Sequence, residues 1–418
     1  MSRVLIYTSP ARGHLYPMMD VALDLQAAGH DVVVQTLAAE RERLAVAGVA
    51  HRAIAPAIEA LVLRDYQAGN PMAGILAGFD TWLARAPHEI DDLRAACDEF
   101  DPDLLVVDVN TWGAGAFAEA RDRRWAMFLP YALPLASPDT PAFGLGLTPP
   151  RHALDRLRDA ALRGLTQRVT RSRFQRVDRL RAELGLGGVG RFDGLFERPD
   201  VVLYRTAVPF DYPRRHWPPN VHPIGPGLWA PPGDAPDWLA DLPRPRTLVS
   251  VSTELQEDGA IIEAALRGLA DEPGSVVVTS AALDPADFAP PHERMRVTRF
   301  LPHAAVVGEV DVVVTHGGMG TTQRALAAGV PVVVVPWGRD QHETARRAEQ
   351  SGAGVIVSRA KLSPERLRAA VREARTRRPQ AETVARAFSE AGGAGRARTL
   401  LEGLLGDAAP QAQARRVA

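Results

Sequence analysis

The chain has 418 residues, of which 46% are hydrophobic and 24% charged, and its formal net charge is −1. This length is too great for one ordinary hydrophobic core and predicts two domains. The near-neutral charge balance gives no global basic field, so we expect no nucleic-acid partner. Cys97 is the only cysteine, which excludes an internal disulfide and any multi-cysteine metal site.

The sequence opens almost at once on an apolar strand at Val4–Tyr7, without the charged and apolar regions of a signal peptide. No run of about 18 apolar residues follows, so we expect no membrane span and a cytoplasmic location. Whether two copies pair as a homodimer is left open.

The first half alternates short apolar runs with amphipathic stretches, a pattern typical of a parallel, doubly wound α/β sheet. Its strands are expected at Val4–Thr8, Val32–Thr36, Leu104–Val107 and, as the last one, Val201–Tyr204; its helices are expected at Tyr16–Ala28, from near Trp112, and through residues 150–185. A second series repeats this pattern. Its strands are expected at Thr247–Val251, Ser275–Thr279, Arg296–Phe300, Val310–Thr315, Val332–Val335 and Gly354–Val357.

Prolines and glycines are dense between the two series, which is typical of a linker. We therefore predict an N-terminal domain at residues 1–215, a linker at 216–245 and a C-terminal domain at 246–390. Residues 391–418 are expected to form a helix and a tail that pack back on the N-terminal domain.

The sharpest local motif is a glycine-rich turn, Thr315–Thr322, between an expected strand and an expected helix. Backbone N–H groups converge at such a helix N-terminus, and the helix dipole favours anions there, so the turn suits a phosphate. The next strand leads into Pro336–Gln341, at the sheet edge where open α/β sheets bind ligands. The carboxylate of Asp340 and the amide of Gln341 suit the vicinal hydroxyls of a sugar.

Together these motifs resemble the signature of nucleotide-sugar-dependent glycosyltransferases of the GT-B fold, in which two Rossmann-like, doubly wound parallel-sheet domains face each other across a cleft. The likeness is greatest to bacterial antibiotic glycosyltransferases acting on macrolides, enediynes and aromatic polyketides. It implies that the N-terminal domain binds the acceptor and the C-terminal domain the nucleotide-sugar donor. The donor residues implied are Ser252, Thr253, Phe300, Leu301, His316, Gly317, Gly318, Gly320, Thr321, Asp340 and Gln341.

The resemblance also assigns parts to these donor residues. His316 and the turn amides would hold the diphosphate beside Ser252 and Thr253, and Phe300 would stack on the base, although a core aromatic is an equal alternative for Phe300. Many relatives carry an acidic ribose-binding residue eight positions after the motif histidine, where this chain has Arg324. That departure favours a deoxyribose donor such as a dTDP-sugar, unless Gln323 or backbone groups bind the ribose.

The first expected strand opens into a loop containing His14, and Asp108 ends the expected strand Leu104–Val107. Parallel strands bring both residues to one sheet edge, where a carboxylate can orient a histidine base. The alternative is a structural histidine and a helix-capping aspartate. As a pair they predict an inverting transfer: His14 deprotonates an acceptor hydroxyl, which displaces the diphosphate without a metal or another cofactor.

An apolar acceptor is expected from aromatic residues of the first half, although each of them alone suits a core. The candidates are Phe79, Trp82, Trp112, Tyr131 and Phe143. The function predicted is transfer of a deoxysugar to a small natural product in antibiotic biosynthesis. The alternatives are a drug-inactivating transferase that uses UDP-glucose and a non-catalytic nucleotide-sugar-binding activator. A nicotinamide oxidoreductase is a distant fourth, because neither half carries its phosphate fingerprint.

Overall fold

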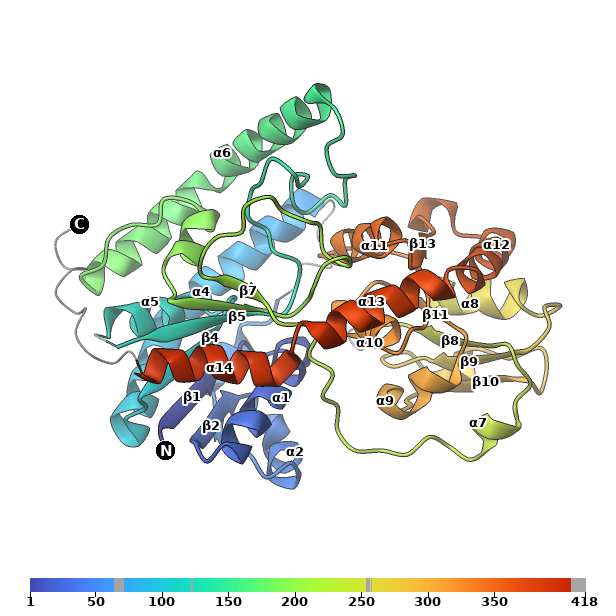
Figure 1. Ribbon diagram of the computed structural model, residues 1–418, viewed down its shortest axis with the longest axis horizontal. Coiled ribbons are helices and arrows are strands. Elements are labelled where there is room, and N and C mark those ends of the chain that lie inside the picture. The colour runs from blue at the N-terminus through green and yellow to red at the C-terminus, as the bar shows by residue number, and fades with distance from the viewer. Residues whose placement is uncertain (64–70, 122, 253–255, 257, 407–418) are drawn as a thin grey trace.

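The computed structural model describes residues 1–63, 71–121, 123–252, 256 and 258–406. The chain forms two α/β domains side by side, each built on a wholly parallel sheet with helices on its faces (Figure 1). The strands read as continuous apolar runs because both faces of each sheet are buried. None of the helices in these residues is both long and apolar enough to cross a membrane.

The first sheet has seven strands in the order β3-β2-β1-β4-β5-β6-β7. Their bounds are β1 Arg3–Tyr7, β2 Asp31–Thr36, β3 Ala50–Ala53, β4 Leu104–Asp108, β5 Trp125–Leu129, β6 Val201–Tyr204 and β7 Val221–Pro223. Its helices are α1 Arg12–Ala27, α2 Arg41–Val46, α3 Pro56–Ala60, α4 Pro71–Phe100, α5 Trp112–Ala120 and α6 Ala153–Glu183.

The first sheet therefore continues one strand beyond Val201–Tyr204, and the prediction that this strand is the last one is wrong. Strand β7 pairs in parallel with β6 and lies inside the stretch predicted as the linker. It escaped prediction because it has only three residues and follows the proline pair at positions 218 and 219. Such a short strand at a sheet edge carries almost no periodic signal.

The second sheet has six strands in the order β10-β9-β8-β11-β12-β13. Their bounds are β8 Arg246–Ser250, β9 Ser275–Thr279, β10 Met295–Thr298, β11 Val312–Thr315, β12 Val332–Val334 and β13 Gly354–Ile356. The helices of this half are α7 Trp238–Asp241, α8 Gly259–Gly268, α9 His303–Val306, α10 Met319–Ala327, α11 Gln341–Gln350, α12 Pro364–Arg375 and α13 Arg378–Glu390.

The last helix, α14 Gly393–Gly406, leaves the second domain and crosses to the first, where it lies along α1 (Figure 1). Ala397 and Leu401 are fully buried in the same hydrophobic cluster as Met18 of α1. Arg398 Nε donates to Asp24 Oδ2 of α1 at 2.8 Å. Helix α14 thus completes the core of the N-terminal domain, whereas the predicted tail at residues 407–418 lies outside the described residues.

In both sheets the strand order reverses next to the first strand, between β1 and β4 and between β8 and β11. The loops after such neighbouring strands lead to opposite faces of the sheet and open a crevice at their carboxyl ends, where ligands bind in this architecture. Each domain therefore presents one crevice, formed by the loops after these two strands.

Candidate active site in the interdomain cleft

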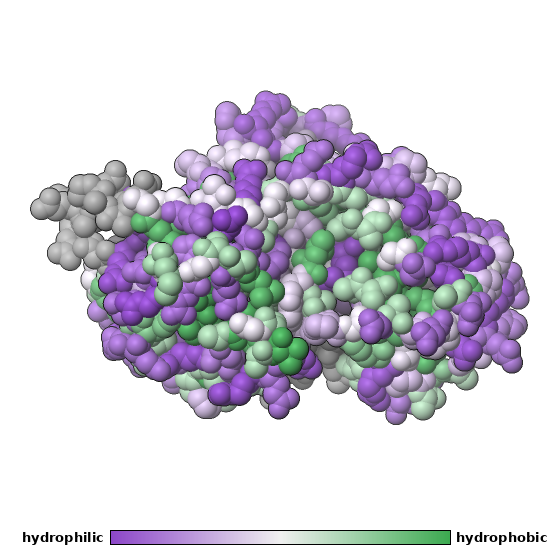
Figure 2. Space-filling model, turned by 60° about the horizontal axis from the view of Figure 1, so that its bottom comes forward, coloured by the Kyte–Doolittle hydropathy of each residue, from purple (hydrophilic) through white to green (hydrophobic). Residues whose placement is uncertain are grey.

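A single large cleft of about 1890 Å³ joins the two crevices and takes residues from both domains. Hydrophobic residues gather around the hollow between the two halves of the surface (Figure 2). The N-terminal domain contributes the loop after β1, the stretch after β5 and parts of α4 and α6. The C-terminal domain contributes the loops after β8, β11 and β12.

On the N-terminal side, His14 and Asp108 form a hydrogen-bonded pair. The register Tyr7↔Val107 brings the carboxyl ends of β1 and β4 together, so His14, in the first turn of α1, meets Asp108, the last residue of β4. His14 Nδ1 lies 2.7 Å from Asp108 Oδ2, and the side chain of Asp108 is fully buried. A buried carboxylate at this distance orients the imidazole and stabilises its protonated form.

Asp108 also has a structural role, but it does not cap α5, whose N-cap residue is Thr111 and which has no side-chain cap hydrogen bond. Its Oδ1 accepts the backbone N–H of Asn110 at 2.8 Å, while the hydroxyl of Thr111 donates to the Asp108 carbonyl at 2.6 Å. One carboxylate oxygen therefore holds the loop before α5 and the other faces His14. The two contacts reinforce each other, because the loop fixes the carboxylate that is hydrogen-bonded to His14.

Asn110 and Tyr131 extend this pair, and Asn110 was not predicted from the sequence. The side-chain amide Nδ2 of Asn110 lies 3.4 Å from His14 Nε2, and its Oδ1 accepts the phenol of Tyr131 at 2.9 Å. The Tyr131 ring also meets the edge of the His14 ring at 5.9 Å between centroids. A donor at Nε2 and an acceptor at Nδ1 together favour the tautomer with its proton on Nδ1.

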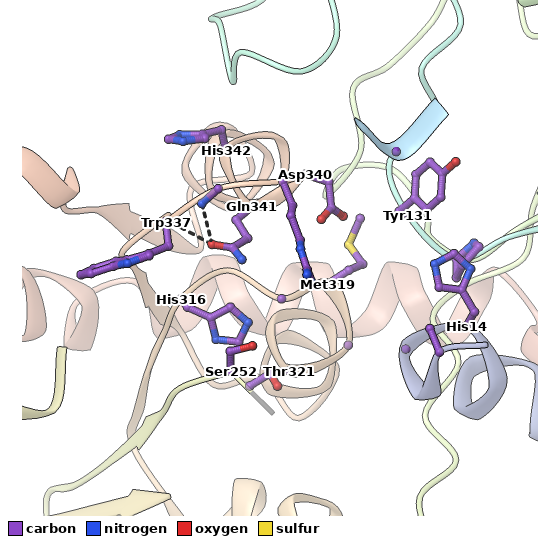
Figure 3. Close-up of a pocket in the computed structure, with 18 of the residues that line it drawn as sticks. His14, Tyr131, Ser252, His316, Met319, Thr321, Trp337, Asp340, Gln341 and His342 are labelled. Atoms are coloured by element: carbon purple, nitrogen blue, oxygen red, sulfur yellow. Dashed lines mark hydrogen bonds between the residues drawn. The ribbon is translucent and has the colours of Figure 1, made fainter. Parts of the chain in front are cut away.

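On the C-terminal side, the glycine-rich turn joins β11 to α10 (Figure 3). The residues of the turn that border the cleft are His316, Gly318, Met319, Gly320 and Thr321, whereas Gly317 is buried and does not line it. Gly317 has φ +99°, and a Cβ there would come within 2.9 Å of the Val334 side chain. The turn therefore needs glycine to pass this close to β12. Gly318 is the N-cap residue of α10, and Gly320 lies exposed in its first turn. Burial lowers the pKa of His316, which keeps the imidazole neutral and able to donate one N–H.

The other donor residues take different positions around this turn. Ser252 lines the cleft beside His316, and its backbone N–H donates to Asp258 Oδ2 at 2.8 Å. Thr253 lies outside the described residues. Phe300 is 72% exposed and borders the cleft, which excludes the alternative that it is a core aromatic, whereas Leu301 is buried.

Asp340 and Gln341 begin α11 and differ in what their side chains contact. Asp340 points across the cleft toward His14 and Tyr131 (Figure 3), and burial raises the pKa of its carboxyl group. Gln341 Oε1 accepts the backbone N–H groups of Trp337 and Gly338 at 2.8 and 3.1 Å. Its Nε2 donates to Gln256 Oε1 at 3.0 Å, so in this structure the amide holds the loop after β12 in place.

Arg324 and Gln323, the two residues expected to bear on the choice of donor nucleotide, contact the linker and the N-terminal domain, respectively. The guanidinium of Arg324 donates to the carbonyls of Leu228 at 2.8 Å and of Trp229 at 3.1 Å. The amide of Gln323 is buried and donates to the carbonyl of Arg205 at 2.9 Å. Arg324 borders the cleft, but its described hydrogen bonds go to the linker.

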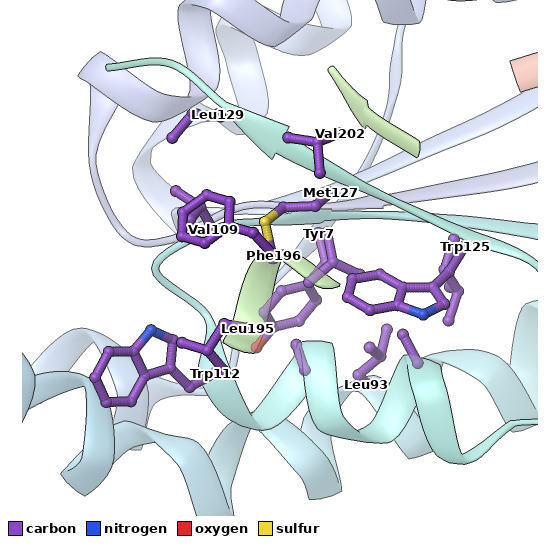
Figure 4. Packing of buried hydrophobic residues seen from close by; sticks show 14 of the residues in the cluster. Tyr7, Leu93, Val109, Trp112, Trp125, Met127, Leu129, Leu195, Phe196 and Val202 are labelled. Carbon is purple, nitrogen blue, oxygen red and sulfur yellow. The ribbon is translucent and has the colours of Figure 1, made fainter. Parts of the chain in front are cut away.

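Four of the five aromatic candidates for the acceptor border the cleft: Phe79, Trp82, Tyr131 and Phe143. Trp112 does not. It is buried in the core of the N-terminal domain (Figure 4), where its ring lies 5.2 Å from that of Phe79 and 5.4 Å from that of Trp82. As the first residue of α5, which packs against α4, Trp112 turns its ring inward and supports the two rings that form the wall.

Two Rossmann-like domains that face each other across a cleft define the GT-B class of glycosyltransferases, and comparison with known proteins identifies the family. Residues 263–395 match the family described as "Erythromycin biosynthesis protein CIII-like, C-terminal domain". The "4'-demethylrebeccamycin synthase" of Lentzea aerocolonigenes is 35% identical over 385 residues, which cover 89% of this chain and 91% of that protein. The chain belongs to the family of antibiotic-biosynthesis glycosyltransferases, and it is a sugar-transferring enzyme.

Solved structures agree in fold at lower sequence identity. The calicheamicin glycosyltransferase CalG4 is similar with a TM-score of 0.77 and 21% identity, over 98% of this chain and 100% of that chain. The glycosyltransferase VinC, solved in complex with DTDP, is similar with a TM-score of 0.68 and 21% identity, over 97% of this chain and 99% of that chain.

Proposed function

We propose that this enzyme is an inverting glycosyltransferase that moves a deoxysugar from dTDP to a hydroxyl group of a small apolar natural product. The observation that carries the proposal is the placement of the His14–Asp108 pair and the glycine-rich turn after β11 on opposite sides of one cleft. A base for the acceptor and an anion site for the leaving group are the two parts that such a reaction needs.

In the proposed mechanism, His14 Nε2 takes the proton of the acceptor hydroxyl while Nδ1–H donates to Asp108. The acceptor oxygen forms its bond to the anomeric carbon on the face opposite the diphosphate, and the bond from that carbon to the diphosphate oxygen breaks. The amides of the first turn of α10 and the N–H of His316 stabilise the charge on the departing diphosphate. No step of this mechanism requires a metal ion or another cofactor.

Asn110 and Asp340 take supporting parts in this proposal. The acceptor oxygen, when it donates its proton to His14 Nε2, also comes within reach of the Asn110 amide, which lies 3.4 Å from that nitrogen. Asp340 faces the same space from the opposite domain and suits a hydroxyl group of the donor sugar. The two substrates would therefore meet between Asn110 and Asp340.

The proposed acceptor class rests on three aromatic residues of the cleft, Phe79, Trp82 and Phe143, which we call the apolar wall. Phe79 and Trp82 stand 5.6 Å apart between ring centroids and border the cleft together with Phe143. Flat, apolar faces of this kind favour an aromatic or otherwise apolar acceptor over a polar sugar or peptide.

His14→Ala tests the base. We expect the rate of transfer to fall by about 100- to 10,000-fold, because the variant lacks the group that deprotonates the acceptor. The affinity for the nucleoside diphosphate should stay unchanged, because that site lies in the other domain. Glycoside formation and nucleotide binding are measured on the same preparation. Undiminished turnover would remove His14 as the base.

A thermal-shift comparison of dTDP with UDP tests the donor. The position of Arg324, where relatives carry an acidic residue, supports a deoxyribose, and VinC was solved with DTDP. We therefore expect the larger increase in Tm with dTDP at equal concentrations, since a tighter ligand stabilises the folded state more. A larger shift with UDP would contradict the dTDP proposal and favour the UDP-glucose-dependent alternative.

A further inference from the structure

The first turn of α11 faces two parts of the cleft at once. Its N-cap residue, Asp340, points toward the space between the domains, and Glu343, one turn later, points to the acceptor-side loop, which we define as residues 130–152 between β5 and α6. This loop belongs to the N-terminal half and carries Phe143, part of the apolar wall. One helical turn is thus in contact with both proposed substrate sites.

Glu343 holds the second half of the acceptor-side loop through the backbone amides of Gly144 and Gly146. Its Oε1 accepts the N–H of Gly144 at 2.8 Å and that of Gly146 at 2.9 Å, and its side chain is 1% exposed. Gly146 has φ +58°, and a Cβ there would lie 2.5 Å from the carbonyl oxygen of His342. Arg346 Nε donates to the Gly146 carbonyl at 2.8 Å. The loop therefore lies directly against the backbone of α11.

A chain of buried polar contacts runs from Glu343 to the near end of the same loop. Glu343 Oε2 accepts from Arg347 at 2.7 Å, and Arg347 Nε donates to Asp211 Oδ1 at 2.6 Å. Asp211 Oδ2 accepts the Tyr204 hydroxyl at 3.0 Å, which in turn accepts the N–H of Leu133 at 2.9 Å. The network fixes both ends of the loop segment that contains Phe143 to one helix of the opposite domain.

Every member of this network needs its partner, because buried charges are unfavourable unless they are paired and hydrogen-bonded. Truncation of Glu343 would leave two amides and the guanidinium of Arg347 without their carboxylate. The loop would then lose the hydrogen bonds from Gly144 and Gly146 to α11 and keep the one that Arg346 donates to the Gly146 carbonyl. The glycine-rich turn and α10, which form the proposed diphosphate site, would keep all their described contacts.

We propose that Glu343 is a positioning residue that couples the acceptor-side loop to α11, the helix whose N-cap residue is Asp340. This coupling would hold the acceptor and the donor sugar in a fixed position relative to each other. This inference rests on the proposed function of the cleft. Glu343 does not touch the reacting atoms; it sets the position of the wall that orients the acceptor. An unoriented acceptor lets water compete for the donor.

The test compares Glu343→Ala and Glu343→Gln with the wild-type enzyme. In Glu343→Ala we expect the acceptor KM and the ratio of donor hydrolysis to transfer to rise on the order of tenfold, with the Kd for the nucleoside diphosphate unchanged. Glu343→Gln keeps an oxygen for the two glycine amides, so it should lie closer to the wild type. A rise in the Kd for the nucleoside diphosphate as large as the rise in the acceptor KM would overturn the proposal, and so would an unchanged acceptor KM.

Two further measurements separate this role from general destabilisation. Glu272→Ala is the matched control, since Glu272 is a buried carboxylate of the same domain, paired with Arg372 at 2.6 Å and remote from the cleft. It should leave the hydrolysis ratio unchanged. Hydrogen exchange of the Gly144 and Gly146 amides, measured without ligand, should accelerate in Glu343→Ala and stay slow in Glu272→Ala. Slow exchange in Glu343→Ala would contradict the contact itself.

These readouts also separate failure of this inference from failure of the proposed function. If the wild-type enzyme binds no nucleoside diphosphate and transfers no sugar, the proposed function is wrong, whatever the exchange data show. If the wild type transfers sugar and Glu343→Ala does so with normal acceptor KM, only the positioning role is wrong. Should Glu343→Ala fail to fold, Glu343→Gln and its exchange rates decide the question.

Discussion

Asn110 stands two residues after Asp108, and its two amide atoms face two different partners. Nδ2 approaches His14 Nε2, whereas Oδ1 accepts from Tyr131, so the phenol determines which end of the amide faces the histidine. No sequence pattern pointed to Asn110, because an asparagine in a loop before a helix is ordinary turn chemistry. A neutral amide beside the proposed base leaves Asp108 as the carboxylate hydrogen-bonded to His14.

Asn110→Asp is expected to move the acidic limb of the pH–kcat profile to higher pH, on the order of one unit. A carboxylate beside the imidazole stabilises its protonated form, which cannot act as a base, so more alkaline solution is needed for activity. The measurement is kcat across the pH range for the variant and the wild type. Asn110→Ala, which adds no charge, should lower kcat without moving the limb. An unmoved limb in Asn110→Asp would contradict the placement of Asn110 beside Nε2.

At the scale of elements, α4, which carries Phe79 and Trp82 of the cleft, packs against α5. Glu89 of α4 is fully buried and its Oε2 accepts the N–H of Gly113 in the first turn of α5 at 2.9 Å. Among the described residues its other oxygen has no hydrogen-bond partner. Burial, which is the largest cause, raises the pKa of the Glu89 carboxyl to about 8.

The raised pKa of Glu89 predicts how stability depends on pH. Between its ordinary value of 4.5 and about 8, the folded protein holds a proton that the unfolded chain has lost, so this contribution is complete below pH 4.5 and lost as pH rises through 8. Glu89→Gln, which stays neutral, should match the wild type in Tm near pH 5 and exceed it near pH 9. Thermal unfolding at both pH values measures this difference. An equal Tm of the two proteins at pH 9 would show that ionisation of the Glu89 carboxyl does not destabilise the folded protein.

At the scale of the whole molecule, several described segments join the two domains, among them the linker, the acceptor-side loop and α14. Arg324 of α10 holds two carbonyls of the linker, Glu343 of α11 holds the loop, and α14 inserts Leu401 into the core of the first domain. These connections come from separate parts of the chain. They make the relative placement of acceptor and donor a property of the whole molecule.

Leu401→Ala is expected to reduce the free energy of unfolding of the N-terminal domain by about 2–5 kcal/mol, because it removes a fully buried side chain from a packed core. Urea unfolding followed by intrinsic fluorescence measures the loss. Leu154→Ala is the matched control, since Leu154 on α6 is 79% exposed and should cost no more than about 0.5 kcal/mol. Equal stability of the Leu401 variant and the wild type would show that α14 is dispensable for the first domain.

Much of this molecule follows from local sequence. Apolar runs of four to six residues, separated by helical stretches, predicted parallel sheets, and strands such as β6 and β9 fall at the predicted residues. The glycine-rich turn after β11 and the pair His14 and Asp108 were also visible, since each follows a strand and parallel strands deliver their ends to one edge. Each of these residues is marked by its place after an expected strand, which is why the sequence alone determined them.

What only the tertiary structure decided are contacts between residues 96 to 197 positions apart. Glu343 lies against Gly146, Arg324 against Leu228, and Asn110 against His14, and none of these pairs shares a periodic pattern. The exposure of a side chain was likewise decided only by the tertiary structure. Phe300 borders the cleft while Trp112 is buried, although the sequence left both open as core or site residues. Such properties depend on how the two domains and their connecting segments pack, and local propensity carries no information about that packing.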